Sequence, residues 1–373
     1  MKKISIMMIF TLAILLSACS EKISLEKLKP IDDCNEQRLD GGWVCTWADE
    51  FEGDTLDLEK WNYEIDGGGG GNNELQYYTN KNTSVANSVL TITAKKEEYM
   101  GRSYTSSRIT TKYKGDFTYG RFIIRAKNPV GRGTWPAVWM MPTMNSYGIW
   151  PKSGEIDIME YVGYDPTRVH GTIHTERFNH GLGTQLGGSV TLPTANQEFH
   201  DYEIIWKPGA ITWFVDGDQY YEVNYTPQFT SDSKYNEAFP FDKPFFLILN
   251  LAIGGNWGGV QGVDDSIFPA AFEIDFVRVY KLDYASVDKK TPEKVANINK
   301  AQVANTIHWQ RAFDDYDIEK YAIYVDGKFN GYSNLNQYTL VGLEPNKSYN
   351  ITIEAIDFVG RTSKLSEPFV YNT

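Results

Sequence analysis

The chain has 373 residues, of which 42% are hydrophobic and 14% aromatic, including 24 Tyr and 10 Trp. Its formal net charge is −12, and no cluster of lysines and arginines forms the basic patch that neutralises phosphates, so we expect no nucleic-acid partner. The length predicts two folded units, and the excess of flat, rigid aromatic side chains is typical of proteins that stack against ligands. A neutral polymer is compatible with this charge.

The first 18 residues have the pattern of an export signal. Two lysines precede an apolar run from Ile4 to Leu16, which is too short to span a bilayer. The run ends in Leu16-Ser17-Ala18-Cys19, which resembles a bacterial lipobox and predicts cleavage before Cys19 and lipidation of its sulfur. The alternative is a plain signal peptide with an incidental cysteine. We expect a bacterial membrane-anchored lipoprotein, at the cell surface or in the periplasm, that meets the membrane only through its lipid.

A polar segment follows the signal. Residues 19–40 are rich in lysine and glutamate and show no sustained apolar pattern, so we expect a tether between the lipid and the fold. Export places the chain in an oxidising compartment, which favours a disulfide between Cys34 and Cys45. Two free thiols are the alternative.

From residue 41 to residue 284 the sequence predicts β-structure throughout. Short runs rich in β-branched and aromatic residues recur at 89–93, 121–125, 202–206 and 245–249, with turn signals between them. Asp216-Gly217 separates two further runs and is typical of a hairpin. No long stretch keeps a helical period. Many short strands of this kind predict an all-β sandwich or barrel.

Residues 290–373 form a second, smaller β unit after a polar break that ends in Thr291-Pro292. Its short alternating strands resemble a fibronectin type III domain over nearly their whole length. The spacing from Leu343 and Pro345 to Tyr349 resembles the tyrosine corner of such sandwiches. We see no catalytic cluster in this unit, so we expect a passive spacer, with carbohydrate binding as the alternative.

Three acids fall within six residues, at Glu155, Asp157 and Glu160. In a regular strand Glu155 and Asp157 share one face, whereas Glu160 points to the other. A β-bulge at Ile158-Met159 adds one residue and returns Glu160 to the acidic face. Carboxylates packed this closely raise each other's pKa, a strain typical of functional sites, and a solvated polar face is the alternative.

Paired carboxyl groups on one face are what glycoside hydrolysis requires. One attacks the sugar as a nucleophile, and the other donates a proton to the leaving oxygen. A separation of ~5 Å suits a retaining, two-step mechanism. Neighbouring positions on one face of a strand provide roughly that reach.

The acidic motif and its surroundings resemble glycoside hydrolase family 16, and within it the bacterial laminarinase group of endo-1,3-β-glucanases, over about residues 43 to 281. The matching segments outside the motif are residues 47–51, 72–79, 104–106, 108–109, 135–137, 139–140, 170–172, 174, 249–252 and 254–257. The resemblance implies a β-jelly-roll sandwich whose concave sheet forms an open catalytic cleft.

The same resemblance implies roles for the three acids. Glu155 is the nucleophile, Glu160 is the acid/base, and Asp157 between them tunes their protonation. Catalysis needs no cofactor in this scheme. His170 and His174 show no third ligand in the sequence, so we expect no catalytic metal.

The resemblance also implies a set of substrate-binding residues. Trp135 and Trp139 stack on sugar rings, with positions in the core as their alternative. Asn72, Arg108 and His174 bind the sugar at the cleavage site.

A structural calcium ion is implied on the convex face. Its ligands would be Glu50, Asp275 and a backbone carbonyl near Ser88, and two ordinary surface acids are the alternative. Asn87-Ser88 stands where the family often has Asp-Gly, which weakens the site if the ion requires the conformation of that glycine.

The expected function is that of a retaining endo-β-1,3-glucanase that hydrolyses β-glucan through a glycosyl-enzyme intermediate, and we expect a monomer. A β-1,3-1,4-glucanase and another family 16 polysaccharide hydrolase, acting on agarose or carrageenan, are the alternatives within the enzyme class. A non-catalytic glucan-binding surface lipoprotein is the alternative outside it. The intact trio of acids favours an enzyme.

Overall fold

The computed structural model describes residues 38–226 and 234–373. The expected signal peptide, the expected lipidation site Cys19, most of the expected tether and Cys34 lie outside the described residues. In the part of the chain that is described, no helix is long and apolar enough to cross a membrane. Strand pairing begins at Arg38, inside the segment expected to be a tether, where Arg38 lies opposite Val44.

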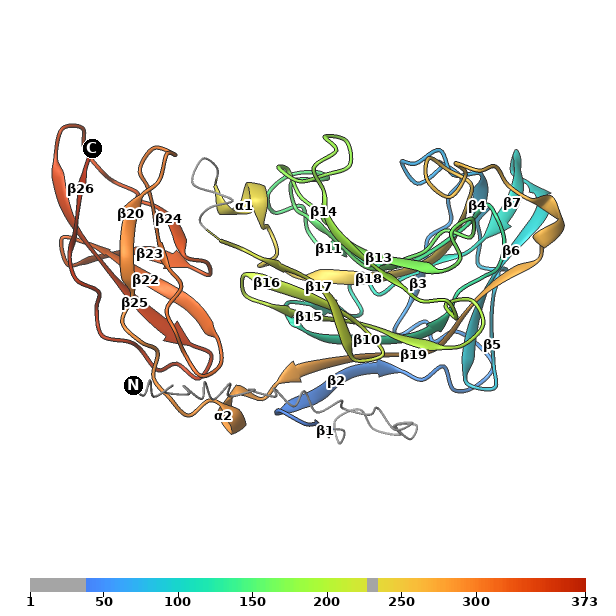
Figure 1. The fold of residues 1–373 in the computed structure, drawn as a ribbon, viewed down its shortest axis with the longest axis horizontal. Coiled ribbons are helices and arrows are strands. Elements are labelled where there is room, and N and C mark those ends of the chain that lie inside the picture. Colours follow the sequence, from blue (N-terminus) through green and yellow to red (C-terminus); the bar gives the residue numbers. More distant parts are fainter. Residues whose placement is uncertain (1–37, 227–233) are drawn as a thin grey trace, which may run out of the picture.

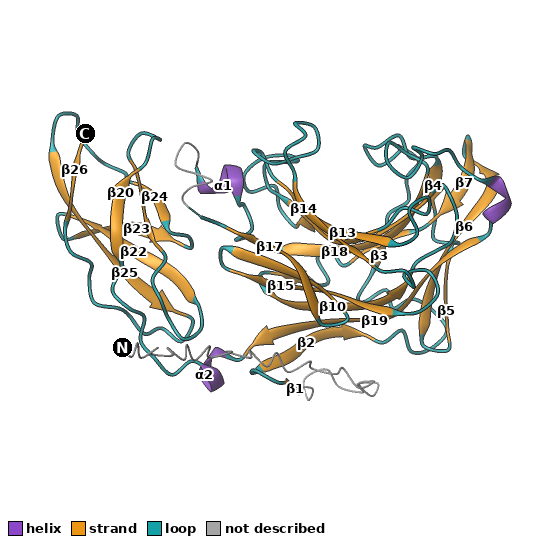
Figure 2. Ribbon diagram, in the orientation of Figure 1, coloured by secondary structure: helices purple, strands orange, loops and turns teal. Residues whose placement is uncertain are grey.

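The larger unit consists of two stacked sheets (Figures 1 and 2). The strands of the outer sheet are β1 (Arg38–Leu39), β2 (Trp43–Asp49), β4 (Gln76–Tyr78), β5 (Thr83–Ala86), β6 (Val89–Tyr99), β7 (Arg102–Ser106), β10 (Gly120–Lys127), β15 (His200–Lys207), β16 (Ala210–Val215), β17 (Asp218–Asn224) and β19 (Ala270–Leu282). Their order is β17-β16-β15-β10-β19-β6-β7-β4, with β2 beside β19, β1 beside β2, and β5 beside β6.

The second sheet is curved, and its concave side faces the loops at the top of Figure 1. Its strands are β3 (Asn62–Tyr63), β8 (Arg108–Thr110), β9 (Asp116–Phe117), β11 (Thr134–Pro142), β12 (Glu155–Glu160), β13 (Arg168–His174), β14 (Leu186–Thr191) and β18 (Phe245–Ile253). They are arranged as β14-β13-β12-β11-β18-β8-β3, with β9 beside β18. The acidic motif is therefore near the centre of this sheet.

The hydrophobic core lies between the two sheets. β12 contributes Ile156, Ile158 and Met159 to it, and β10 contributes Phe122 and Ile124 from the facing sheet. Since neighbouring residues of a strand point to opposite faces, the inward isoleucines direct the acids of β12 towards the concave side. The expectation of an all-β sandwich is confirmed.

Short helices join some of the strands. They are α1 (Tyr235–Ala238), the 3-10 helix η3 (Asp265–Ile267) and α2 (Tyr284–Val287).

The smaller unit is a sandwich of two antiparallel sheets. One contains β20 (Ala296–Lys300), β21 (Thr306–Gln310) and β24 (Gln337–Thr339); the other contains β22 (Ile318–Val325), β23 (Lys328–Ser333), β25 (Ser348–Asp357) and β26 (Phe369–Asn372). Trp309 and Tyr321 are buried in a separate apolar cluster between these sheets. The Glu344 N–H donates to the Tyr349 hydroxyl at 2.8 Å, the hydrogen bond expected of a tyrosine corner.

Apolar and polar contacts join the two units. The ring of Tyr284, from the linker, stacks on Phe358 with centroids 4.1 Å apart and planes 6° from parallel. Leu335 packs into the core of the larger unit. The Lys207 ammonium lies 3.2 Å from the Asp317 carboxylate. The smaller unit therefore docks on the larger one through specific side chains.

Candidate active site

A β-bulge in β12 shapes the site. Along β11, Trp139 lies opposite Asp157, but its neighbour Val138 lies opposite Met159, so Ile158 has no partner. The register along β13 shifts over the same segment. The predicted bulge is confirmed, and it adds the one residue that turns Glu160 to the same side as Asp157.

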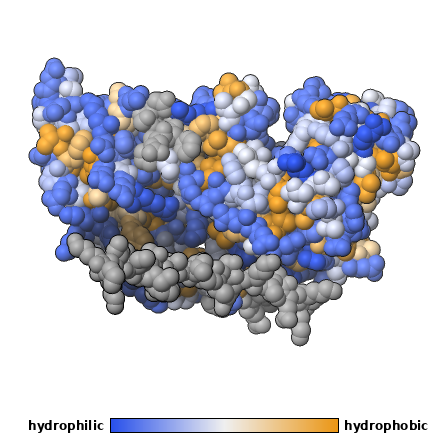
Figure 3. All heavy atoms as spheres, viewed as in Figure 1, coloured by the Kyte–Doolittle hydropathy of each residue, from blue (hydrophilic) through white to orange (hydrophobic). Residues whose placement is uncertain are grey.

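The bulge brings the three acids to one cavity. Glu155, Asp157 and Glu160 all line a cavity of about 560 Å³ on the concave face, whereas the intervening Ile156 and Ile158 are buried in the core. Loops border this cavity on both sides, and the space-filling view shows a notch between them at the upper edge of the molecule (Figure 3). A polymer can therefore approach the acids from solvent.

Each acid has a close polar neighbour from outside the trio. The Trp150 indole N–H donates to Glu155 Oε2 at 2.5 Å, and the Trp135 indole N–H donates to Glu160 Oε1 at 3.2 Å. Nε2 of His174 lies 3.4 Å from Asp157 Oδ2. None of the three acids forms an ion pair with lysine or arginine among the described residues, so the site lacks a strong countercharge.

Burial raises the pKa of all three acids, and the charges of neighbouring acids add to the rise at Glu155 and Glu160. Burial, followed by the Asp157 charge, raises the pKa of Glu155 to about 8. Burial raises the pKa of Asp157 to about 7. Burial and the charges of Asp157 and Glu155 raise the pKa of Glu160 well above its ordinary value. The cluster therefore holds at least one proton at neutral pH, as a site that combines an acid with a carboxylate requires.

One group in the cavity could also hold a metal ion. Glu155, Asp157 and His174 each bring a ligand atom within 4.8 Å of the others. His170, the other histidine weighed as a ligand in the sequence, is not part of this group. The same spacing allows the carboxyl groups of Glu155 and Asp157 to share a proton.

A chain of hydrogen bonds orients Trp139 on the cavity wall. Its indole N–H donates to Asn250 Oδ1 at 2.7 Å, the Asn250 amide donates to the Tyr78 hydroxyl at 3.1 Å, and that hydroxyl donates to Glu74 at 3.0 Å. The Arg108 guanidinium lies over the Trp139 ring, 4.8 Å from its centroid. The ring is thus fixed by its edge and one face.

A second aromatic group stands at the other end of the acids. The Trp135 and Trp257 rings meet edge to face with centroids 5.6 Å apart, and His170 contacts the same Trp257 ring at 5.0 Å. Trp135 therefore contacts an aromatic neighbour and Glu160 at once. The Trp135 ring, which could stack on a sugar, therefore lies directly beside the Glu160 carboxyl group.

The glycine-rich segment at residues 67–71 borders the cavity, which Gly70 and Asn72 both line. Gly70 has a φ of +58°, and a Cβ there would lie 2.3 Å from a carboxylate oxygen of Glu74. Only glycine therefore fits beside the buried Glu74 without displacing it.

All eight residues predicted for the cleft line this one cavity: Asn72, Arg108, Trp135, Trp139, Glu155, Asp157, Glu160 and His174. Sequence reasoning assigned no role to Glu74, Trp150, His180 or Trp257. Glu74 and Trp257 lie in sequence segments that matched the family, so this match could have identified them as residues of the site. Trp150 and His180 lie outside those segments, and their rings meet at 5.0 Å only because two loops fold together.

The residues proposed for calcium have other partners. Both carboxylate oxygens of Glu50 accept hydrogen bonds from Arg278, at 2.8 and 2.7 Å, and Asp275 pairs with Arg125 at 3.3 Å. Ser88 adopts the left-handed conformation, with φ of 57°, that a glycine would supply. The backbone thus has the required shape, but Glu50 as placed does not fit a calcium site unless it gives up Arg278.

Cys45 is in a disulfide bond. Its expected partner, Cys34, lies outside the described residues.

Comparisons with known proteins show that this chain is similar to glycosyl hydrolases. The sequence model described as Glycosyl hydrolases family 16 matches residues 71–278. A beta-glucanase of Rhodothermus marinus is 52% identical over 245 residues, which cover 64% of this chain and 85% of that protein. Glucan endo-1,3-beta-glucosidase A1 of Niallia circulans is 40% identical over 260 residues, but the match covers 38% of its length and 64% of this chain. The X-ray structure of the laminarinase from Rhodothermus marinus superposes with a TM-score of 0.62 at 51% identity, covering 64% of this chain and 98% of that one.

Proposed function

This chain belongs to glycosyl hydrolase family 16, and we propose that it is a retaining endo-β-1,3-glucanase that cleaves laminarin-type β-glucan. The observation that carries the proposal is the bulge in β12, which places Glu155, Asp157 and Glu160 side by side on the wall of one cavity. Relatives named beta-glucanase and laminarinase support the substrate class.

The first step forms a covalent bond to the enzyme. The Glu155 carboxylate attacks the anomeric carbon, and Glu160 donates its proton to the glycosidic oxygen as that bond breaks. The departing glucan leaves as an alcohol, and the sugar stays on Glu155 as an ester. The raised pKa of Glu160 supports its role as the acid, because it keeps the proton available at neutral pH.

The second step restores the enzyme. Glu160, now a carboxylate, takes a proton from water as the water oxygen attacks the same anomeric carbon. The ester bond breaks, Glu155 leaves as a carboxylate, and the product keeps the β configuration. Both carboxyl groups end in their starting protonation states.

Asp157 and His174 support these steps as positioning residues. The Asp157 charge raises the pKa of both glutamates, and loss of a proton from Glu155 returns that carboxylate to its attacking form. His174 faces Asp157 at 3.4 Å, and its electrostatic interaction with Glu155 offsets part of the rise in the Glu155 pKa. Glu155 and Asp157 also share a side-chain hydrogen bond, which keeps the two carboxyl groups in contact.

The experiment compares Glu155→Ala, Glu160→Ala and the exposed control Glu59→Ala. Glu155→Ala should be inactive on every substrate. Glu160→Ala should lose turnover of laminarin by 10²–10⁴-fold but keep its first step on an aryl glucoside, whose leaving group needs no proton. Azide should rescue Glu160→Ala and yield a β-glucosyl azide. Glu59→Ala should behave as the wild type.

Two readouts settle reaction class and substrate. Proton NMR of the first turnovers should show the β-anomer, and an initial α-anomer would overturn both glutamate assignments. Laminarin, lichenan and agarose should be digested side by side, with laminarin degraded fastest to short oligosaccharides. Faster cleavage of lichenan would make the enzyme a mixed-linkage glucanase, and absence of cleavage of all three would favour a glucan-binding protein.

We further propose that the chain is an exported lipoprotein attached through Cys19, and that its smaller unit is a fibronectin type III-like spacer. The lipobox-like residues 16–19 support the anchor. The arrangement of three strands facing four, together with the tyrosine-corner bond of Tyr349, supports the domain type.

A further inference from the structure

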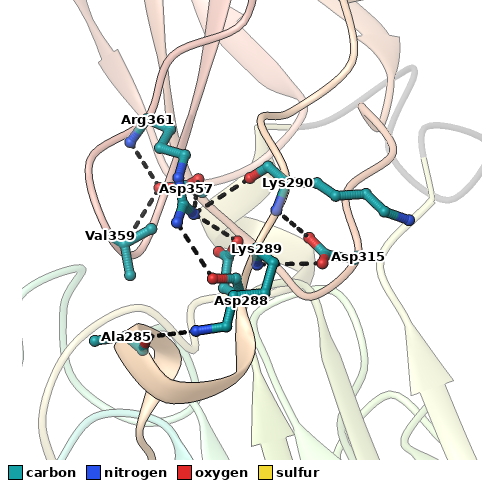
Figure 4. A network of polar contacts seen from close by, with 8 residues as sticks. All are labelled: Ala285, Asp288, Lys289, Lys290, Asp315, Asp357, Val359 and Arg361. Atoms are coloured by element: carbon teal, nitrogen blue, oxygen red, sulfur yellow. Dashed lines mark hydrogen bonds and ion pairs between the residues drawn. The ribbon is translucent and has the colours of Figure 1, made fainter.

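Four aspartates gather where the linker enters the smaller unit. Asp288 directly follows α2, Asp314 and Asp315 lie in the loop between β21 and β22, and Asp357 ends β25. Figure 4 shows Asp288, Asp315 and Asp357 converging from these separate segments, with Arg361 among them. None of these residues has a role in the proposed hydrolysis.

The existing contacts satisfy only part of this cluster. Arg361 Nη1 lies 2.8 Å from Asp288 Oδ1 and 3.4 Å from Asp357 Oδ2. The Asp315 carboxylate accepts the backbone N–H groups of Lys289 and Lys290, both at 3.2 Å. These bonds leave one oxygen of Asp288 and both oxygens of Asp314 without a hydrogen-bond partner, although all three oxygens are buried.

Asp288 is the strongest indication of a missing ligand. Its side chain is 0% exposed, so its unpartnered Oδ2 cannot be satisfied by bulk water. Burying an ionised oxygen without a partner is strongly unfavourable. Both carboxylate oxygens of Asp314 are likewise buried without a hydrogen-bond partner. These unpartnered buried oxygens mark a negative charge that no protein group compensates among the described residues.

The nearby positive side chains are too few to compensate the negative charge of the four aspartates. Arg361 is the one guanidinium that pairs with these carboxylates among the described residues. The Lys289 ammonium donates to the Ala285 carbonyl at 3.0 Å and therefore points away from the cluster. Four carboxylates thus face a single positive side chain.

The geometry fits an oxygen-ligated cation. Asp288, Asp314 and Asp315 each place one carboxylate oxygen within 4.8 Å of the others. Oxygens bound to one Ca²⁺ lie 2.3–2.6 Å from it, so two of them are at most roughly 5 Å apart. Histidine and cysteine ligands would favour a transition metal, and this group contains neither. We propose that the domain junction binds one Ca²⁺ ion through Asp288, Asp314 and Asp315.

Such an ion would brace the docking of the two units. It would tie the linker, through Asp288, to the loop between β21 and β22. The same loop carries Asp317, which pairs with Lys207 of the larger unit, and begins at Arg311, which donates to the Pro208 carbonyl at 3.0 Å. Binding of the ion would therefore hold both sides of the interface in place and stabilise the whole chain.

The test uses the purified protein after removal of metals, titrated with CaCl₂. Asp314→Asn removes a ligand charge without changing side-chain size. Asp275→Asn is the control for calcium on the convex face, and Glu319→Gln is the control for a partly exposed acid of the smaller unit. Bound calcium is measured by equilibrium dialysis, and Tm is measured with calcium and with chelator.

We expect Asp314→Asn to bind one Ca²⁺ fewer than the wild type and to lose the calcium-dependent rise in Tm, because a ligand that binds only the folded state stabilises it by mass action. Both controls should keep that rise. In chelator Asp314→Asn should melt no lower than the wild type, since it removes a buried, unpartnered charge; this order of Tm values reverses in calcium. Equal calcium binding and an equal Tm rise in Asp314→Asn and the wild type, or an equal rise with Mg²⁺ alone, would overturn the proposal.

Discussion

Replacing Glu155 with glutamine should abolish hydrolysis and also stabilise the fold at alkaline pH. Glutamine keeps the acceptor that the Trp150 indole N–H reaches at 2.5 Å, but it carries no charge. Burial and the Asp157 charge raise the pKa of Glu155 from 4.5 to about 8. The folded protein therefore resists ionisation of this side chain, whereas the unfolded chain does not.

The sign and size of the effect follow from this difference. A carboxyl group whose pKa is higher in the folded state contributes stability that is complete below the unfolded pKa, and this stability is lost as pH rises through the folded pKa. Each unit of difference corresponds to about 1.4 kcal/mol, so full ionisation of an isolated Glu155 would cost about 5 kcal/mol. Removal of this charge also lets Asp157 ionise more easily, so we expect roughly 2 kcal/mol of added stability in Glu155→Gln at pH 9.

The measurement is urea denaturation, followed by tryptophan fluorescence, at pH 4.5 and pH 9. The free energies of unfolding of wild type and Glu155→Gln should nearly agree at pH 4.5 and differ at pH 9 in favour of the variant. The exposed control Glu59→Gln should show no pH-dependent difference. A Glu155→Gln variant that is less stable than the wild type at both pH values, or shifted equally at both, would refute the raised pKa of Glu155 in the folded protein.

The remaining predictions concern Asp157, the smaller unit and the N-terminus. Asp157→Asn removes a charge that raises the pKa of Glu160, so the alkaline limb of the kcat/KM profile on laminarin should move to lower pH, and an unmoved limb would contradict this coupling. Truncation after Asp283 removes the Tyr284–Phe358 stack and should lower Tm while turnover of soluble laminarin stays within a few-fold; loss of most activity in a folded truncated protein would place part of the cleft in the smaller unit. Cys19→Ser should move the protein from the membrane fraction to the soluble fraction, and a wild type that is already soluble would exclude the anchor.

Some features of this protein are local and could be predicted from the sequence. The five-residue step from Glu155 to Glu160 is incompatible with one face of a regular strand, so the bulge followed from counting residues. The isoleucines between the acids identified the buried face of the same strand. The hydrogen bond of Tyr349 was also predictable, because its partner Glu344 is five residues away.

Other features depended on contacts between distant segments, which no local pattern specifies. Trp150 donates to Glu155 and meets His180 because the loops that carry them fold over the same end of the cavity. Glu50 was expected to bind a calcium ion, but strand pairing between β2 and β19 brings the Arg278 guanidinium to its carboxylate instead. The aspartate cluster at the domain junction joins residues 288, 314 and 315 only after the linker and the loop meet. Its charge and burial come from the packing of these segments, and therefore the tertiary structure alone decided them.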